Sequence, residues 1–140
     1  LVPSLTAYEN VALIAELTGS GVHERTEEAL ASVGLGDRMD HFPGQLSGGE
    51  QQRVSIARGL VKDPPLMLCD EPTGALDTET GTQVLTLLRD VTDSGDRTII
   101  VVTHNSEIAK IANRVIDLRD GQIVEMHEVE SPMRPADVAW

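Results

Sequence analysis

A short apolar run that ends in two carboxylates constrains the fold of this chain more than any other segment: Leu66-Met67-Leu68-Cys69-Asp70-Glu71. Pro64 and Pro65 precede it and end any helix before them, so the run predicts a short buried strand. Similar runs follow at 98–102 and 115–118, and a segment with helical spacing of its apolar residues, roughly 79–93, separates the first run from the second. The alternation predicts an α/β fold with a parallel sheet whose strands are covered on both faces.

The first third of the sequence has helical patterns instead of strands. Thr6-Ala7-Tyr8-Glu9 is a capping box in front of apolar residues at helical spacing, and Gly19-Ser20-Gly21 predicts the end of that helix. A second helix is predicted at about 24–33, before Gly34-Leu35-Gly36 turns the chain. This part of the chain is therefore expected to be helical.

The end of the sequence carries weaker signals. A short strand is predicted at 122–126, directly after the turn signal Asp120-Gly121. The tail that follows contains Pro132 and Pro135, and we predict that it lacks regular structure.

The segment Ser47-Gly48-Gly49-Glu50 combines a helix start with two glycines. Ser47-x-x-Glu50 is a capping box, which by itself says nothing about function. Glycine costs a helix about 1 kcal/mol relative to alanine, however, so helix stability does not explain Gly48 and Gly49. Bare backbone, free N–H donors, the positive end of the helix dipole and the Ser47 hydroxyl together suit a bound phosphate group.

Asp70 and Glu71 are expected at the carboxyl end of a strand, the edge where open α/β sheets bind ligands. They could form only a polar turn, but two adjacent carboxylates suit phosphoryl transfer better. One can help to hold Mg²⁺ through its water shell, and the other can orient or deprotonate an attacking water. His104 follows the strand predicted at 98–103. Taken alone it would be an ordinary surface histidine.

Four motifs in this order resemble the signature, Walker B, D-loop and histidine-switch motifs of ABC-type ATPases. They are Leu46-Ser47-Gly48-Gly49-Glu50-Gln51-Gln52, the run ending in Asp70-Glu71, Pro72-Thr73-Gly74-Ala75-Leu76-Asp77, and Val101-Val102-Thr103-His104. The 140 residues contain no G-x-x-x-x-G-K-[ST] phosphate loop.

The sequence is thus similar to the second half of a nucleotide-binding domain. The resemblance implies part of the parallel sheet of a RecA-like P-loop NTPase with helices on both faces, preceded by part of an α-helical subdomain. We expect the helical subdomain at 1–45, the C-terminal part of the ATPase core at 46–126 and a tail at 127–140.

The resemblance also implies roles for single residues. Asp70 would be the magnesium carboxylate and Glu71 the catalytic base, while the His104 imidazole would contact the γ-phosphate and help to fix the attacking water. A second set of residues would act at the interface with a second ATP-binding subunit. Its members are Ser47, Gly48, Gly49 and Glu50, which would contact ATP held by the opposite subunit, and Asp77, which would cap its helix and signal between the two ATP sites.

The segment from Leu1 to Val11 is similar to the one just after the Q-loop glutamine in importers and exporters of this class. Combined with Glu71-Pro72-Thr73-Gly74-Ala75-Leu76-Asp77, it is most similar to the lipoprotein-releasing and macrolide-export branch of bacterial transporters. In that branch the helical subdomain contacts a transmembrane permease subunit. The resemblance therefore implies a cytoplasmic ATPase, peripheral on the inner face of the cell membrane, that binds ATP and Mg²⁺ and powers export or release of a substrate. It reaches the membrane only through the permease.

Composition agrees with this interpretation. A net charge of −12 argues against a nucleic-acid or anionic-membrane surface. No segment approaches the roughly 18 apolar residues needed to span a bilayer. Leu1-Val2-Pro3-Ser4 has neither an initiator Met nor a secretory signal, so residue 1 is interpreted as a truncation point and the protein as intracellular.

Two alternatives remain open. One is a non-transport ATPase that shares the signature, although such proteins interrupt this region with a very long coiled coil and no sustained heptads occur before Ser47. The other is a non-catalytic interaction module. By resemblance the phosphate-loop strand would lie between the strands at 98–102 and 115–118, so its absence would leave two unpaired edges.

Overall fold

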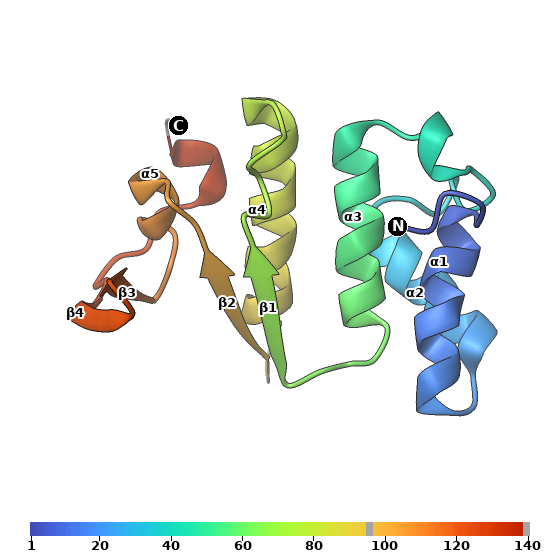
Figure 1. The fold of residues 1–140 in the computed structure, drawn as a ribbon, viewed down its shortest axis with the longest axis horizontal. Helices are drawn as coiled ribbons and strands as arrows, with labels where there is room; N and C mark the ends of the chain where they lie inside the picture. Colours follow the sequence, from blue (N-terminus) through green and yellow to red (C-terminus); the bar gives the residue numbers. More distant parts are fainter. Residues whose placement is uncertain (95–96, 139–140) are drawn as a thin grey trace.

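The structure, a computed structural model, describes residues 1–94 and 97–138 (Figure 1). Its first part is helical, as predicted: α1 spans Ala7–Ala15, a 3-10 turn follows at Glu16–Thr18, and α2 spans Val22–Ser32. The capping box is present, because Glu9 N donates to Thr6 Oγ1 (3.2 Å) and Thr6 N donates to Glu9 Oε2 (2.7 Å). Helix α2 begins two residues before the predicted start, directly after Gly21, whose φ of 75° lies in the left-handed region.

The connection between α2 and the next helix is tied to the start of α1. Ala7 N donates to the His41 carbonyl (2.8 Å) and Tyr8 N donates to the Met39 carbonyl (2.9 Å). A 3-10 turn at Pro43–Gln45 then leads into α3, Gly48–Leu60. One apolar core runs through these helices and into the strands beyond them. None of the helices in the described residues is long and apolar enough to cross a membrane.

Helix and strand alternate from α3 onward, which confirms the predicted α/β fold. Strand β1 (Leu66–Asp70), helix α4 (Thr78–Asp93), strand β2 (Thr98–Val102) and the short helix α5 (Ser106–Ala109) follow in order. The two strands are parallel and in register from Leu66↔Thr98 to Asp70↔Val102. Alternate side chains of β1, Met67 and Cys69, pack toward α3 and α4, and in the view of Figure 1 α4 lies behind β1, with β2 on the other side of β1 from α3.

The opposite face of this two-stranded sheet is open, so the expectation of strands covered on both faces is wrong for the described residues. Leu68 is 69% exposed and Val102 56% exposed, and Leu66 and Ile100 lie on the same face. The apolar runs have the composition of buried strands. Within residues 1–94 and 97–138, only one side of β1 and β2 meets helices.

A separate hairpin follows, made of β3 (Arg114–Arg119) and β4 (Gln122–Glu128). The turn residues Asp120 and Gly121 both have positive φ (52° and 75°), as tight hairpin turns require. The hairpin is antiparallel and does not pair with β2. Among the described residues, the strands at 98–102 and 115–118 are thus each paired on one side only, with β1 and β4 respectively, and the two unpaired edges that were expected are present. Leu118 is 71% exposed, so this strand too is not covered on both faces.

The tail is more ordered than the sequence predicted. Strand β4 extends to Glu128, a 3-10 turn forms at Pro135–Asp137, and Val138 is buried against Leu85, Ile108 and Ile111. Met133 N also donates to the Lys110 carbonyl (2.9 Å). The prediction that the tail at 127–140 lacks regular structure is therefore wrong for the described residues, because Val138, directly after the turn, completes a small apolar cluster. Residues 139–140 lie outside the described part of the chain.

Candidate functional site

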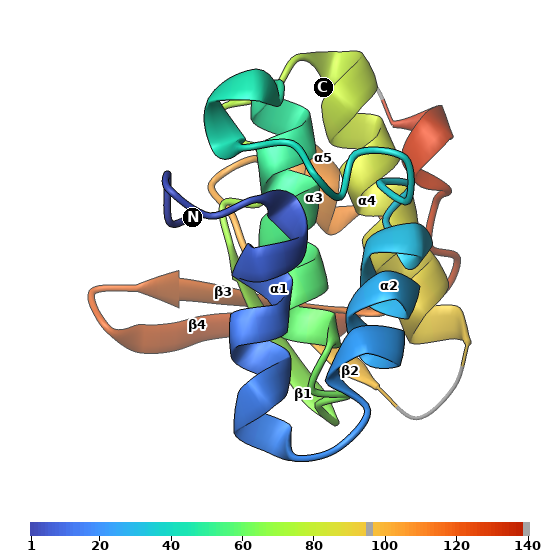
Figure 2. The ribbon, with the colours of Figure 1, turned by 90° about the vertical axis from the view of Figure 1, so that its right-hand side faces the viewer.

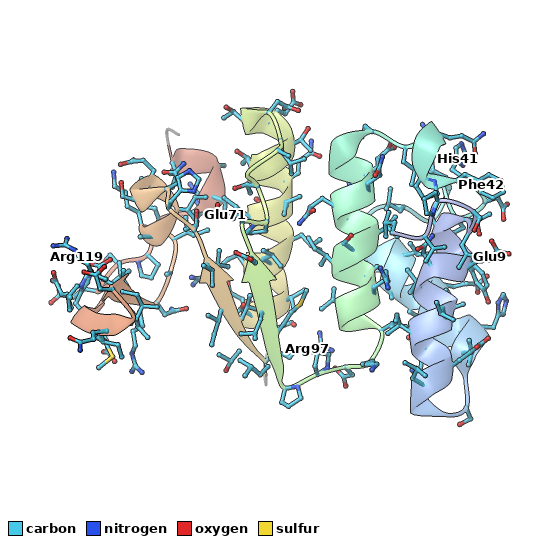
Figure 3. All side chains as sticks on the ribbon, in the orientation of Figure 1. Glu9, His41, Phe42, Glu71, Arg97 and Arg119 are labelled. Carbon is cyan, nitrogen blue, oxygen red and sulfur yellow. The ribbon has the colours of Figure 1, made fainter. Side chains whose placement is uncertain are left out.

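The motifs identified in the sequence converge on one side of the molecule. Helices α3 and α4 both begin there, and β1 and β2 both end there (Figure 1). This is the carboxyl edge of the parallel strands, where helix starts and strand ends present polar groups to a ligand. Figure 3 labels Glu71 at this edge and Arg97 at the opposite end of the strands.

Glu71 is held at the end of β1 in an unusual backbone conformation. Its N–H donates to the Val102 carbonyl (2.9 Å), which extends the pairing with β2 by one residue. Its φ is 43°, in the left-handed region that residues other than glycine adopt rarely. Such conformations concentrate at functional sites, where surrounding contacts hold them in place.

The Glu71 carboxylate is bound by the residues that follow β2. Oε1 accepts a hydrogen bond from His104 N (2.9 Å) and lies 2.7 Å from His104 Nδ1, while Thr103 Oγ1 donates to Oε2 (3.3 Å). These hydrogen bonds, above all the one from the His104 ring, lower the pKa of Glu71 below its ordinary value. Glu71 is therefore an anion at neutral pH, and the side chain of His104, which contacts it, is 88% exposed.

Asp70 ends β1 on its open face, next to Val102, and is exposed. The described residues contain no cluster of three or more side chains that could hold a metal by themselves. Mg²⁺ bound with a nucleotide needs only one or two carboxylates, since waters and phosphate oxygens supply the other ligands. The donor set at Asp70 and Glu71 therefore fits a nucleotide-bound Mg²⁺.

The start of α3 has the capping box that the sequence predicted. Glu50 N donates to Ser47 Oγ (3.2 Å), and Ser47 N donates to Glu50 Oε2 (2.8 Å). The hydrogen bond from the Ser47 backbone is the main reason why the pKa of Glu50 is lowered. Arg38 Nε lies 3.9 Å from Glu50 Oε1 and adds a weaker attraction. Glu50 thus stabilises the helix start, and a contact of Glu50 with ATP stays a prediction.

Gly48 and Gly49 differ in their surroundings. Gly48 is exposed, and an added Cβ would come no closer than 4.0 Å to Leu76 Cδ2. Gly49 is buried, and an added Cβ would lie 2.0 Å from Thr80 Cγ2. Helix packing therefore requires glycine at 49, whereas the open space at 48 is consistent with the predicted approach of an anion.

Asp77 caps α4. Its Oδ1 accepts from Thr80 N (3.0 Å) and its Oδ2 accepts from Thr80 Oγ1 (2.8 Å). The bond from the Thr80 backbone is the main cause that lowers the pKa of Asp77. The capping role is confirmed, and signalling across a subunit interface stays a prediction.

Two contact residues were missed by the sequence analysis. Thr103 donates to Glu71, and Thr80 bonds Asp77 while it packs on Gly49. The contact of Thr80 with Asp77 could have been predicted, because Thr80 lies three residues after the helix cap and the third residue of a helix donates its N–H to the cap. The contact with Gly49 depends on tertiary packing that sequence spacing does not reveal.

Comparison with known proteins places these motifs in a family. The family model described as "ABC transporter" matches residues 1–74, more than half of the chain. The chain belongs to the ABC transporter family. The order of motifs and the geometry around Glu71 agree with this assignment.

Two relatives from the branch named in the sequence analysis match nearly the whole chain. The macrolide export ATP-binding/permease protein MacB of Wolinella succinogenes is 50% identical over 131 residues, which cover 91% of this chain and 20% of that protein. The lipoprotein-releasing system ATP-binding protein LolD of Syntrophus aciditrophicus is 50% identical over 127 residues, which cover 89% of this chain and 57% of that protein. This ABC transporter chain thus spans only part of its relatives.

A solved structure matches the fold. MJ0796, described as a bacterial ABC transporter cassette in a dimeric structure, aligns with a TM-score of 0.81 at 39% identity, over 94% of this chain and 60% of that one. A second structure of the same cassette, described as a dimeric post-hydrolysis state bound to ADP and Pi, also has a TM-score of 0.81, at 38% identity. The likeness shows that the chain has the ATP-binding cassette fold, which confirms the predicted P-loop NTPase class.

Proposed function

We propose that this chain supplies the Walker B, histidine-switch and signature groups of an ATP-hydrolysing subunit that powers export or release of a substrate across or from a membrane. The single observation that carries the proposal is the Glu71 carboxylate held by His104 at the carboxyl edge of β1 and β2. The names of the relatives, which include macrolide export and lipoprotein release, support a transport role.

In this proposal Glu71 acts on the attacking water. Its lowered pKa keeps it ionised, so it accepts a hydrogen bond from the water and orients it. The same lowered pKa makes it a weak base while His104 is bound to it. When the His104 ring turns to a γ-phosphate, the largest cause of the lowered pKa is removed, and Glu71 becomes a stronger base at the moment of attack.

Asp70 is assigned to the nucleotide-bound Mg²⁺, held through water ligands. The ion would neutralise negative charge on the phosphates during transfer. Asp70 is exposed next to Glu71, which supports this assignment. Of the two adjacent carboxylates at the end of this strand, Asp70 would thus help to neutralise charge through Mg²⁺ while Glu71 orients the water.

The start of α3 is assigned to the ATP of a second copy of the subunit. Ser47 and Gly48 are exposed at a helix start whose first N–H groups and dipole favour a phosphate. Gly49 and Glu50 would support this site by packing and capping. The solved relative is described as dimeric, which supports a pair of subunits, and the assignment of this helix start to the partner's ATP requires that they be arranged head to tail.

Residues 1–45 are assigned to contact with a transmembrane permease, so the subunit would be cytoplasmic and peripheral on the inner face of the membrane. Val2 is held at the start of α1 by Asn10 Oδ1 (2.8 Å), and the segment that ends in His41 is bonded to Ala7. Val2 (38% exposed) and Phe42 (44% exposed) offer apolar side chains on these segments. Figure 3 shows Phe42 far from Glu71.

The proposal is tested by mixing two inactive versions of the complete protein. Ser47→Asp keeps a good helix cap but places a negative charge where the phosphate would bind. Glu71→Gln removes the carboxylate with little change of shape. In a head-to-tail dimer the mixed pair regains one intact site, with Glu71 from the first version and Ser47 from the second, so mixing restores ATP hydrolysis.

Ser47→Thr serves as the control, because it keeps both the cap and the hydroxyl, and it should retain activity. If mixed dimers form but hydrolyse no more ATP than either version alone, the assignment of Ser47 and Glu71 to opposite subunits is wrong. If Glu71→Gln alone hydrolyses ATP normally, the catalytic assignment is wrong.

A second candidate function is that of a non-catalytic module completed by another chain. The exposed apolar face of β1 and β2, which includes Leu68 and Val102, favours it. We expect the 140-residue chain by itself not to hydrolyse ATP, because its sequence contains no phosphate loop. Detectable ATP hydrolysis by the purified 140-residue chain, abolished by Glu71→Gln, would contradict this expectation.

A further inference from the structure

Thr80, on the first turn of α4, contacts two motifs at once. Its N–H and its hydroxyl both donate to the Asp77 carboxylate, at 3.0 and 2.8 Å. Its Cγ2 methyl lies where a side chain at Gly49 would have to go. One threonine therefore joins the start of α3 to the cap of α4. Figure 2 shows the two helices beginning on the same side of the molecule.

The contact on the α3 side is unusually close. A Cβ at Gly49 would lie 2.0 Å from Thr80 Cγ2, a separation that real side chains do not reach, but 3.4 Å from Thr80 Cβ, which is tight and tolerable. The methyl group is thus the only part of Thr80 that demands glycine at 49. Because packed interiors do not compress, the start of α3 cannot move toward α4 without displacing Thr80.

The contact on the α4 side is polar and directional. The hydroxyl of Thr80 binds Asp77 Oδ2 while its amide binds Oδ1, so both carboxylate oxygens are held by the same residue. Leu76, directly before Asp77, is the neighbour that an added Cβ at Gly48 would meet, at 4.0 Å from its Cδ2, so the contact there is looser than the one at Gly49. The position of the Asp77 carboxylate is therefore tied to that of Thr80 by two hydrogen bonds.

We propose that Thr80 is a positioning residue that couples the phosphate-binding start of α3 to Asp77, so that binding of ATP at one site changes ATP binding and hydrolysis at the other. The inference rests on the proposed function, in which Ser47 and Gly48 bind the partner's ATP and Asp77 lies at the subunit interface. Thr80 itself touches no substrate. It acts through the methyl group on Gly49 and the hydroxyl on Asp77.

The two contacts can be removed separately. Thr80→Ser keeps the hydroxyl that binds Asp77 and removes the methyl that packs on Gly49. Thr80→Val keeps a methyl for Gly49 and removes the hydroxyl. Thr86→Val is the matched control, because Thr86 is an exposed threonine two turns further along α4 whose hydroxyl donates only to the Thr82 carbonyl (2.8 Å).

The first test measures the ATP dependence of hydrolysis by the complete protein. Both Thr80 variants should lower kcat by about tenfold, within the range of coupling between contacting residues. The Hill coefficient for ATP should fall toward unity in both, whereas Thr86→Val should leave kcat and the Hill coefficient unchanged. A purely structural role would instead reduce the amount of folded protein and leave the Hill coefficient of the folded fraction unaltered.

The second test uses a compensating pair. Gly49→Ala should destabilise the complete protein, because the new methyl overlaps Thr80 Cγ2. Adding Thr80→Ser should restore its melting temperature, since the overlapping methyl is gone, but should not restore the Hill coefficient. Recovery of stability alone would separate packing from coupling and support the proposal.

The outcomes are distinguishable. Normal kcat and cooperativity in both Thr80→Ser and Thr80→Val would overturn the coupling role while leaving the proposed ATPase function intact. Failure of Thr80→Ser to relieve the Gly49→Ala defect would overturn the packing contact on which the coupling depends. Absence of ATP hydrolysis in the unmodified complete protein would overturn the proposed function and with it this inference.

Discussion

His104 binds Glu71 twice, with its backbone N–H 2.9 Å from Oε1 and its ring Nδ1 2.7 Å from the same oxygen. The two residues lie 33 positions apart in sequence. They meet because β1 and β2 are parallel and in register, so the residues that follow the two strands share one edge of the sheet. The fold itself therefore assembles this pair.

Removal of the His104 ring should change the titration of Glu71. His104→Ala deletes the largest cause of the lowered pKa, so the pKa of Glu71 should rise toward its ordinary value of 4.5. NMR titration of the labelled Glu71 carboxyl carbon measures the shift. His127→Ala, on the outlying hairpin, is the control and should leave Glu71 unchanged. An unaltered Glu71 titration in His104→Ala would show that the ring bond does not act on the carboxylate in solution.

The cap of α4 should give the protein an acid-dependent stability. The pKa of Asp77 is lowered in the folded state, so unfolding is accompanied by proton uptake in acid. The stabilisation is present above the unfolded value of 3.8 and is lost as the pH falls through the lower folded-state pKa. Free energies of unfolding measured across this range should fall more steeply with acid in the unmodified protein than in Asp77→Asn. Equal slopes would contradict the ionised cap.

The packed tail should contribute to stability. Val138 is 7% exposed and contacts Leu85, Ile108 and Ile111, so Val138→Ala should lower the free energy of unfolding by about 1–2 kcal/mol. Met133→Ala, at a residue 39% exposed on the same tail, should have a smaller effect. Chemical denaturation of both variants gives the comparison. If Met133→Ala lowers the free energy of unfolding as much as Val138→Ala does, the burial of Val138 does not make a special contribution to the stability of the tail.

The open apolar face should make the 140-residue chain self-associate. Leu68 is 69% exposed on β1, and its apolar neighbours on β2 form a continuous surface that water disfavours. Leu68→Lys should reduce the concentration dependence of sedimentation. Leu17→Lys is the matched control, because Leu17 is 72% exposed but lies on the 3-10 turn after α1, away from the sheet. If both lysines act equally, added charge and not this face explains the change.

Local rules predicted much of the fold. The capping boxes at Thr6 and Ser47 and the cap at Asp77 mark helix starts within a residue of those observed, because side-chain oxygens at these positions satisfy N–H groups that every helix leaves free. The parallel pairing of β1 and β2 followed from the alternation of helix and strand. Glu71 and His104, both predicted site residues, are in contact because each follows one of these two parallel strands.

Features that depend on tertiary packing could not be predicted from the sequence. Gly49 looked like a residue selected for anion approach, but its contact with Thr80 also requires glycine. The exposure of Leu68 could not be inferred, because an apolar run carries no sign of which of its faces other segments of the chain cover. The positive φ of Glu71 is a third case, since no sequence pattern marks this residue for a left-handed backbone conformation.

The most direct test of the account is the rate of phosphate release by the complete protein with Glu71→Gln, measured together with equilibrium binding of ATP. Turnover should fall by about a hundredfold or more while ATP binding is retained, because the substitution removes the group that orients and deprotonates water but not those that hold the nucleotide. Glu79→Gln, at an exposed residue on the first turn of α4, should hydrolyse ATP normally. Near-normal turnover in Glu71→Gln would contradict the assignment of catalysis to this carboxylate.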